Sequence, residues 1–207
     1  MALSVKEARD YMASTTPDND PKDRFIHSAY VDRYNEGSDD DKRRLVDAME
    51  ALLTGGVDWE QKMAAAFFKT VGAAADVLDR LLAHYAQHGG APIADLLGHS
   101  WYALNAAQAA AARSLFVHDP TGQIALAAAA LVDDDGSAWD ALARTIATSD
   151  DAAVLAAAFE GAYSASREDD FFAAMKSRPA PLVRATAALM SATSSSKLLD
   201  ACGIGRN

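Results

Sequence analysis

Hydrophobic residues recur at helical spacing along most of the chain, and glycine, proline or acidic residues separate these runs. The clearest apolar stripe lies between residues 45 and 53 and a second between residues 77 and 85, and a glycine pair follows each of them. Apolar residues three or four positions apart mark one face of a helix, and glycine after them ends it. Because no segment alternates with period two, the sequence predicts an all-α fold.

Capping signals set the expected helix boundaries. Ser4 and Glu7 have the spacing of a capping box. Ser38 is expected to cap the helix that carries the apolar stripe at residues 45–53. Asp58 with Gln61 is expected to cap the next helix. The other expected helices cover roughly residues 20–35, 93–97, 101–116, 121–132, 139–146, 151–164, 168–177, 180–192 and 195–202. The breaker-rich segment from Thr15 to Pro21 predicts a short helical arm, residues 1–16, before a single all-helical domain, residues 17–207.

Comparable apolar residues near helix starts recur at Met63, Ile93, Ile124, Val154 and Val183. The steps between them are 30, 31, 30 and 29 residues. A fixed period of this length is typical of proteins built from repeated helix–turn–helix units.

The last repeat begins at Pro179 and runs to Met190. Proline suits a helix start, because the first turn needs no N–H partner there. Residues 181–189 read Pro-x-Val-Arg-x-x-Ala-Ala-Leu, which resembles the second helix of a HEAT-type repeat. The resemblance implies helix hairpins stacked as a short α-solenoid. An irregular multi-helix bundle is the alternative, because alanine-rich sequences align with one another easily.

The composition indicates close packing through small residues and a negatively charged surface. Half of the residues are hydrophobic, but 47 of the 207 are alanine, which favours helices in close contact. The formal net charge of −10 repels phosphate backbones, so nucleic acid is an unfavourable partner. Several acidic runs fall at expected helix starts, where carboxylates cap free N–H groups: Asp18/Asp20, Asp39–Asp41, Asp133–Asp135, Asp150/Asp151 and Glu168–Asp170.

A few features of the sequence indicate the cellular compartment. Cys202 is the single cysteine, which fits a reducing compartment, and the first residues show no basic segment followed by an apolar run. The longest apolar run, residues 124–132, is too short to span a bilayer. We therefore expect a cytoplasmic protein without a membrane segment.

The sequence offers few signals for metal or cofactor chemistry. His84 and His88 are four residues apart, as in a zinc pair, but no Glu-x-x-His or His-Glu-x-x-His pattern accompanies them. The run Asp133–Gly136 lacks the first and last carboxylates of a calcium loop. We predict no metal, no cofactor and no catalytic residue.

Polar residues stand out where alanine otherwise dominates, between residues 99 and 113. Trp101, Asn105 and Gln108 follow helical spacing, so one helix face would present an aromatic ring and two amides. His99 and Arg113 flank this stretch and complete the predicted ligand-binding or partner-binding site.

Two functions are compatible with these features. The first is a non-enzymatic protein-binding module for a basic partner, such as a bacterial immunity-type inhibitor or an adaptor, because stacked hairpins offer extended surfaces and negative charge attracts basic proteins. The alternative is a small-molecule-binding protein or enzyme with a pocket around Trp101, Asn105 and Gln108. The oligomeric state does not follow from the sequence.

Overall fold

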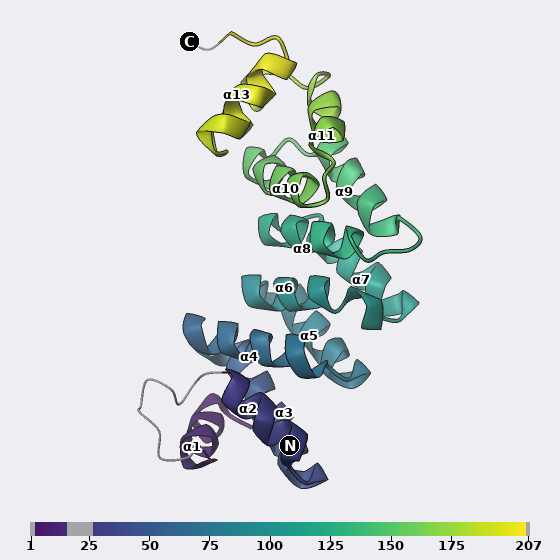
Figure 1. Ribbon diagram of the computed structural model, residues 1–207. Coiled ribbons are helices and arrows are strands. Elements are labelled where there is room, and N and C mark those ends of the chain that lie inside the picture. The colour runs from purple at the N-terminus through teal and green to yellow at the C-terminus, as the bar shows by residue number, and fades with distance from the viewer. Residues whose placement is uncertain (1–2, 16–26, 206–207) are drawn as a thin grey trace. The chain divides into compact units, whose positions relative to one another are not determined.

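The computed structural model describes residues 3–15 and 27–205, and every secondary-structure element in these ranges is helical. The all-α prediction is confirmed. The chain divides into two compact units, residues 1–96 and 97–207, and the division falls within helix α6 (Ala91–His99), labelled in Figure 1. Across the described ranges no helix is long and apolar enough to cross a membrane. Most of the breaker-rich segment around residue 16, and the beginning of the helix expected from residue 20, lie outside the described residues.

Helix α3 (Asp39–Gly55) is the centre of the first unit. It packs against four others, α1 (Val5–Thr15), α2 (His27–Glu36), α4 (Asp58–Val71) and α5 (Ala75–His88). The apolar stripes predicted in α3 and α5 face this core, whose fully buried side chains include Leu45, Met49, Leu52, Phe67, Phe68, Leu78 and Leu81. Amphipathic periodicity therefore located the core of this unit correctly.

The helix caps of the first unit agree with the sequence at two places and differ at one. The Ser4 N–H donates to Glu7 Oε2 at 2.8 Å, and Ser38 forms a capping box with Asp41. The predicted Asp58–Gln61 cap is wrong, because Val57 is the N-cap residue of α4 and its N–H donates to Glu60 Oε2 at 2.8 Å. Glu60 lies at the third helical position, where a carboxylate can reach back to the N-cap residue.

Glu60 also joins α4 to α1 through a bidentate ion pair. Arg9 donates from Nε to Oε1 at 2.7 Å and from Nη2 to Oε2 at 2.8 Å, although Glu60 is only 2% exposed. Hydrogen bonds from Arg9 hold the pKa of the Glu60 carboxyl below its ordinary value, against the opposing effect of burial. The ionised pair therefore stabilises the fold fully above the ordinary pKa of glutamate, and this contribution is lost as the pH falls through the lower pKa of the folded chain.

We predict that Glu60→Gln lowers the thermal midpoint by about 2–4 °C at pH 7, because the amide loses one of the two acceptors for the Arg9 guanidinium. The difference from the parent chain should shrink toward zero as the pH falls through the lowered pKa of Glu60 in the folded chain, because the parent carboxyl is then protonated too. Circular dichroism melts across pH measure both effects. Glu160→Gln, at an exposed site on another helix, is the control and should change the midpoint little at any pH. A pH-independent loss in Glu60→Gln would contradict the prediction.

The helices of the second unit pack as two rows. The unit begins with the end of α6, and a 3₁₀ turn at Trp101–Ala103 and α7 (Ala106–Phe116) follow. Helix α7 packs on α8. Along one row α10 lies between α8 and α12, and along the other α11 lies between α9 and α13, as Figure 1 shows for α8, α10, α9 and α11. The bounds are α8 Pro120–Ala130, α9 Ser137–Thr148, α10 Ala152–Ser164, α11 Glu168–Met175, α12 Ala180–Ala188 and α13 Ala192–Ala201. Within this unit, helix pairs therefore stack in succession.

The period of about thirty residues corresponds to one helix pair. Its five marker residues fall on alternate helices, α4, α6, α8, α10 and α12. Met63, Ile93, Val154 and Val183 are buried, but Ile124 is 49% exposed. Its neighbour Gln123 is fully buried instead and donates from Nε2 to the carbonyl of Phe116 at 2.6 Å. The expected apolar position in α8 is thus taken by a glutamine that satisfies the C-terminal end of α7.

Small residues allow α8 and α10 to approach closely. The buried positions of these two helices are largely alanine and glycine, including Ala125, Ala127, Ala129, Ala158, Gly161 and Ala162. A side chain at Gly161 would have its Cβ 2.6 Å from the Cβ of Ala127, closer than carbon atoms pack. The alanine content therefore serves this contact, as the composition predicted.

The single helix predicted over residues 101–116 is wrong. The 3₁₀ turn at Trp101–Ala103 ends at Leu104, and both Leu104 and Asn105 have extended backbone before α7 begins. Asn105 is the N-cap residue of α7, and the helical spacing of residues 101, 105 and 108 therefore does not define one helix face.

Candidate functional site

Each of the two side-chain amides of the predicted site accepts a hydrogen bond from the backbone N–H of the other residue. Asn105 Oδ1 accepts a hydrogen bond from the N–H of Gln108 at 3.0 Å, and Gln108 Oε1 accepts one from the N–H of Asn105 at 3.0 Å. This is a reciprocal capping box, in which both side chains satisfy free N–H groups at the start of a helix. The sequence contains the Asn-x-x-Gln spacing of a capping box, but the helix-forming alanines around it favoured the prediction of one continuous helix over residues 101–116.

The other predicted residues divide between surface and core. Trp101 is 5% exposed, whereas His99 is the exposed last residue of α6, so their side chains do not share one open face. The Arg113 guanidinium lies over the Trp101 ring, 5.7 Å from its centroid. Arg113 also donates to Ser137 Oγ at 2.6 Å and so connects α7 to the start of α9. Whether these five residues bind a ligand stays a prediction.

The segment that Arg113 contacts is the acidic turn, residues 133–137, between α8 and α9. Asp133 Oδ2 accepts hydrogen bonds from the N–H of Ala138 at 2.5 Å and from Ser137 Oγ at 3.2 Å. Asp135 Oδ1 accepts from the N–H of Ser137 at 2.8 Å. These contacts fix the turn and place negative charge at the N-terminus of α9, where the helix dipole favours it.

Asp135, in the acidic turn, has a lowered pKa. Hydrogen bonds from the Ser137 hydroxyl and backbone lower the pKa of Asp135, with smaller contributions from Asp133 and from the positive charge of Arg113. A lowered pKa favours the ionised carboxylate at neutral pH. Asp135 thus presents a negative charge at the surface of the second unit.

Beside the acidic turn lies a hollow of about 440 Å³, which we name the tryptophan hollow. It lies at the end of α8, the start of α9 and the turn between α10 and α11. Its lining combines one aromatic ring, one guanidinium, carboxylates and small or apolar side chains: Ala130, Leu131, Asp135, Gly136, Trp139, Asp140, Ala165 and Arg167. A ligand in this hollow would meet apolar surface and negative charge together.

Arg167 is placed over Trp139 by the end of α10. The N–H of Arg167 donates to the carbonyl of Ala162 at 2.7 Å and the N–H of Ser166 to that of Tyr163 at 3.0 Å, the pair of bonds that defines a Schellman C-cap. Ser166 accordingly has φ of 55°, in the left-handed region. The Arg167 guanidinium then lies 4.2 Å from the centroid of the Trp139 ring, a favourable cation–π distance.

The residues next to Leu131 and Arg167 in the chain, two lining residues of the tryptophan hollow, are apolar and acidic. Leu131 is 60% exposed and Val132 is 49% exposed, immediately before the acidic turn. Helix α11 packs against α9 and carries Glu168, Asp169 and Asp170 in its first turn. Exposed aliphatic side chains bordered by charge are typical of surfaces that bind other proteins.

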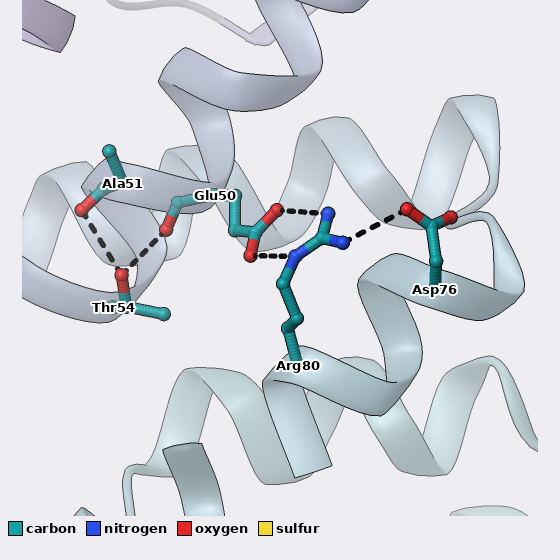
Figure 2. Close-up of polar contacts among 5 residues, drawn as sticks. All are labelled: Glu50, Ala51, Thr54, Asp76 and Arg80. Atoms are coloured by element: carbon teal, nitrogen blue, oxygen red, sulfur yellow. Dashed lines mark hydrogen bonds and ion pairs between the residues drawn. The ribbon is translucent and has the colours of Figure 1, made fainter. Parts of the chain in front are cut away.

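A hollow of about 470 Å³ in the first unit is lined by Glu50, Asp76 and Arg80 among others. Arg80 forms a bidentate pair with Glu50, at 2.7 and 2.8 Å, and donates from Nη1 to Asp76 at 2.9 Å. Figure 2 shows this network, and beside it Thr54 donates to carbonyls of its own helix. Hydrogen bonding to Arg80 lowers the pKa of Asp76. Because these charges satisfy one another, they join α3 to α5 and offer little to a ligand.

The histidine pair lines another hollow of the first unit, of about 370 Å³. The rings of His84 and His88 are 4.6 Å apart, and burial together with the charge of His88 lowers the pKa of His84. Within the described ranges, no group of three or more histidine, cysteine, aspartate or glutamate side chains could hold a metal ion.

Known proteins give no guide to the site. Comparison of the chain with family models, with curated proteins and with solved structures finds no match. The tryptophan hollow is the strongest candidate for a binding site, because it combines a cavity, an aromatic ring, two carboxylates and one guanidinium.

Proposed function

We propose that this chain is a non-enzymatic protein-binding module that binds a basic segment of a partner protein at the tryptophan hollow. The observation that carries the proposal is the meeting of exposed Leu131, the Trp139 ring and the carboxylates Asp135 and Asp140 in one hollow. The apolar groups supply burial on binding, and the carboxylates supply attraction and orientation for positive charge.

The stacked helix pairs of the second unit support this proposal, because successive hairpins offer a broad surface at their turns. Resemblance to HEAT-type repeats, many of which bind proteins, points the same way. The net charge of −10 would speed encounter with a basic partner. An inhibitor of a basic enzyme, such as a bacterial immunity protein, and an adaptor are the two roles that fit, and we place both in the cytoplasm.

The alternative function, a small-molecule pocket around Trp101, Asn105 and Gln108, gains no support from the geometry. Both amides are used in the capping box of α7, and Trp101 and Gln108 are buried. Neither amide needs a ligand to satisfy it.

A capture experiment with matched variants tests the proposal. Asp135→Asn with Asp140→Asn removes two charges from the hollow while an amide oxygen still caps Ser137. Immobilised parent chain should recover a basic partner that elutes with salt, and the double variant should bind the purified partner about tenfold more weakly. Asp32→Asn with Asp39→Asn removes the same charge from exposed sites on α2 and α3 and serves as the control.

Equal binding by the parent chain and the Asp135/Asp140 variant would reject the tryptophan hollow as the binding site. Equal weakening in both double variants would mean that net charge alone attracts the partner. Recovery of a partner that salt does not elute would contradict the electrostatic part of the proposal.

A further inference from the structure

We propose that the tryptophan hollow selects arginine over lysine in its partner, and that Arg167 is an internal occupant which the partner's arginine displaces. This inference rests on the proposed function and adds the chemistry of the residue that is recognised. The occupant is a protein segment in which an arginine lies close to an aliphatic residue.

The position of Arg167 shows what the Trp139 ring accepts. Its guanidinium carbon lies 4.2 Å from the ring centroid, so the ring already binds a guanidinium of this chain. A planar, weakly hydrated guanidinium stacks on an aromatic face, whereas the ammonium of lysine is compact and strongly hydrated. The ring is therefore a better site for arginine than for lysine.

Arg167 is held loosely apart from this stacking. Its contact to a carboxylate, Nε to Asp170 Oδ2, is 3.5 Å long, and its side chain is 45% exposed. Arg9 is 44% exposed as well, but its bidentate pair with Glu60 begins at 2.7 Å. Charge-assisted hydrogen bonds are normally 2.7–2.9 Å long, so the Arg167 pair is weak. Because the Schellman bonds hold only the backbone, the side chain can leave the ring without disturbing α10 or α11.

The surroundings favour a second arginine in place of the first. Asp135 and Asp140 line the same hollow and supply acceptors that a guanidinium fork can use. Leu131, 60% exposed at the edge of the hollow, offers apolar surface to the next side chain of the partner. A partner arginine thus meets the ring, carboxylates and an aliphatic contact, whereas Arg167 has the ring and one long ion pair.

Fluorescence anisotropy with short labelled peptides tests the inference. The probe carries Arg-Leu pairs separated by glycine and serine, and a second peptide carries Lys-Leu pairs at the same positions. The parent chain should bind the arginine peptide roughly two- to fivefold more tightly than the lysine peptide. Arg167→Gln should strengthen binding of the arginine peptide by a further two- to fivefold, because the Trp139 ring is vacated. Trp139→Leu should remove the preference.

Arg144→Gln is the control that separates the effect of freeing the Trp139 ring from the effect of removing one positive charge. Arg144 is exposed on α9, so its replacement removes one positive charge near the hollow and leaves the ring occupied. Equal effects of Arg167→Gln and Arg144→Gln would overturn the role of Arg167 as an occupant. Equal binding of the two peptides, absence of binding to either, or equally tight binding of free arginine would overturn selection of an arginine segment. These results leave the proposed function standing if capture of a basic partner still depends on Asp135 and Asp140.

Discussion

Gly161→Ala should lower the free energy of unfolding by about 2 kcal/mol, although alanine is the better helix former. The new Cβ would lie 2.6 Å from the Cβ of Ala127, 3.3 Å from the carbonyl oxygen of Gln123 and 3.4 Å from Leu142 Cδ2. Neither the Cβ of Ala127 nor the carbonyl oxygen of Gln123 is the end of a flexible side chain, so α10 must move away from α8. Overpacking costs about 1–3 kcal/mol, and a contact of 2.6 Å places this substitution at the upper end of that range. Subtracting the gain of about 1 kcal/mol in helix propensity leaves a net loss of about 2 kcal/mol.

Urea denaturation of single and double variants measures this effect. Ala127→Gly removes the atom that the new methyl group would contact. The double variant should therefore lose about 1 kcal/mol less free energy of unfolding than the sum of the losses of the two single variants. Additive effects would show that the two helices do not meet at these atoms. An increase in stability on Gly161→Ala alone would mean that the contact is looser than the structure has it.

The α8–α10 contact also places the tryptophan hollow. Leu131 directly follows α8, and Ala165 directly follows α10, so the spacing of these helices sets the distance between two walls of the hollow. Close packing of alanine and glycine therefore has a consequence for the proposed binding site as well as for stability.

The periodicity of the sequence predicted helices well because each helix buries one face. It failed at α8, where Ile124 fits the repeat but is exposed and Gln123 is buried. The burial of Gln123 depends on a carbonyl acceptor at Phe116, at the end of the preceding helix. A polar side chain whose partner comes from another helix gives no periodic signal, so hydrophobic pattern alone places it on the surface.

The candidate site was less predictable than the fold for a similar reason. Asn105 and Gln108 have both the spacing of a helix face and the spacing of a capping box, and only the backbone at Asn105 decides between them. Trp139 and Arg167 come from α9 and from the turn before α11, so their contact depends on how two helix pairs stack. The acidic runs were predicted at helix starts, and Asp41 and Asp151 cap α3 and α10 as expected. Asp18 and Asp20 lie outside the described residues. The run at residues 133–135 also borders a hollow.

Arg178→Ala should lower the free energy of unfolding by about 2–3 kcal/mol. Arg178 lies between α11 and α12, and its guanidinium donates to the carbonyls of Ala147 and Ser149, each at 2.5 Å, and to Asp150 Oδ1 at 2.7 Å. The two carbonyls belong to the end of α9, where helix carbonyls lack partners and a cation interacts favourably with the dipole. The Arg178 side chain is only 14% exposed, whereas the Asp150 side chain is 89% exposed. The expected loss therefore comes mainly from the two bonds to carbonyls and less from the ion pair.

Two further arginine variants make this prediction specific. Arg178→Lys keeps the charge but cannot reach three acceptors as a planar fork, so it should recover about half of the lost stability. Arg184→Ala removes an exposed arginine of α12 whose described bond is to the carbonyl of Gly205, and it should cost no more than about 0.5 kcal/mol. Equal losses at positions 178 and 184 would mean that the end of α9 does not depend on Arg178. Since α9 carries Trp139 and the acidic turn precedes it, a real loss at position 178 should also weaken capture of the arginine peptide, even though Arg178 does not line the hollow.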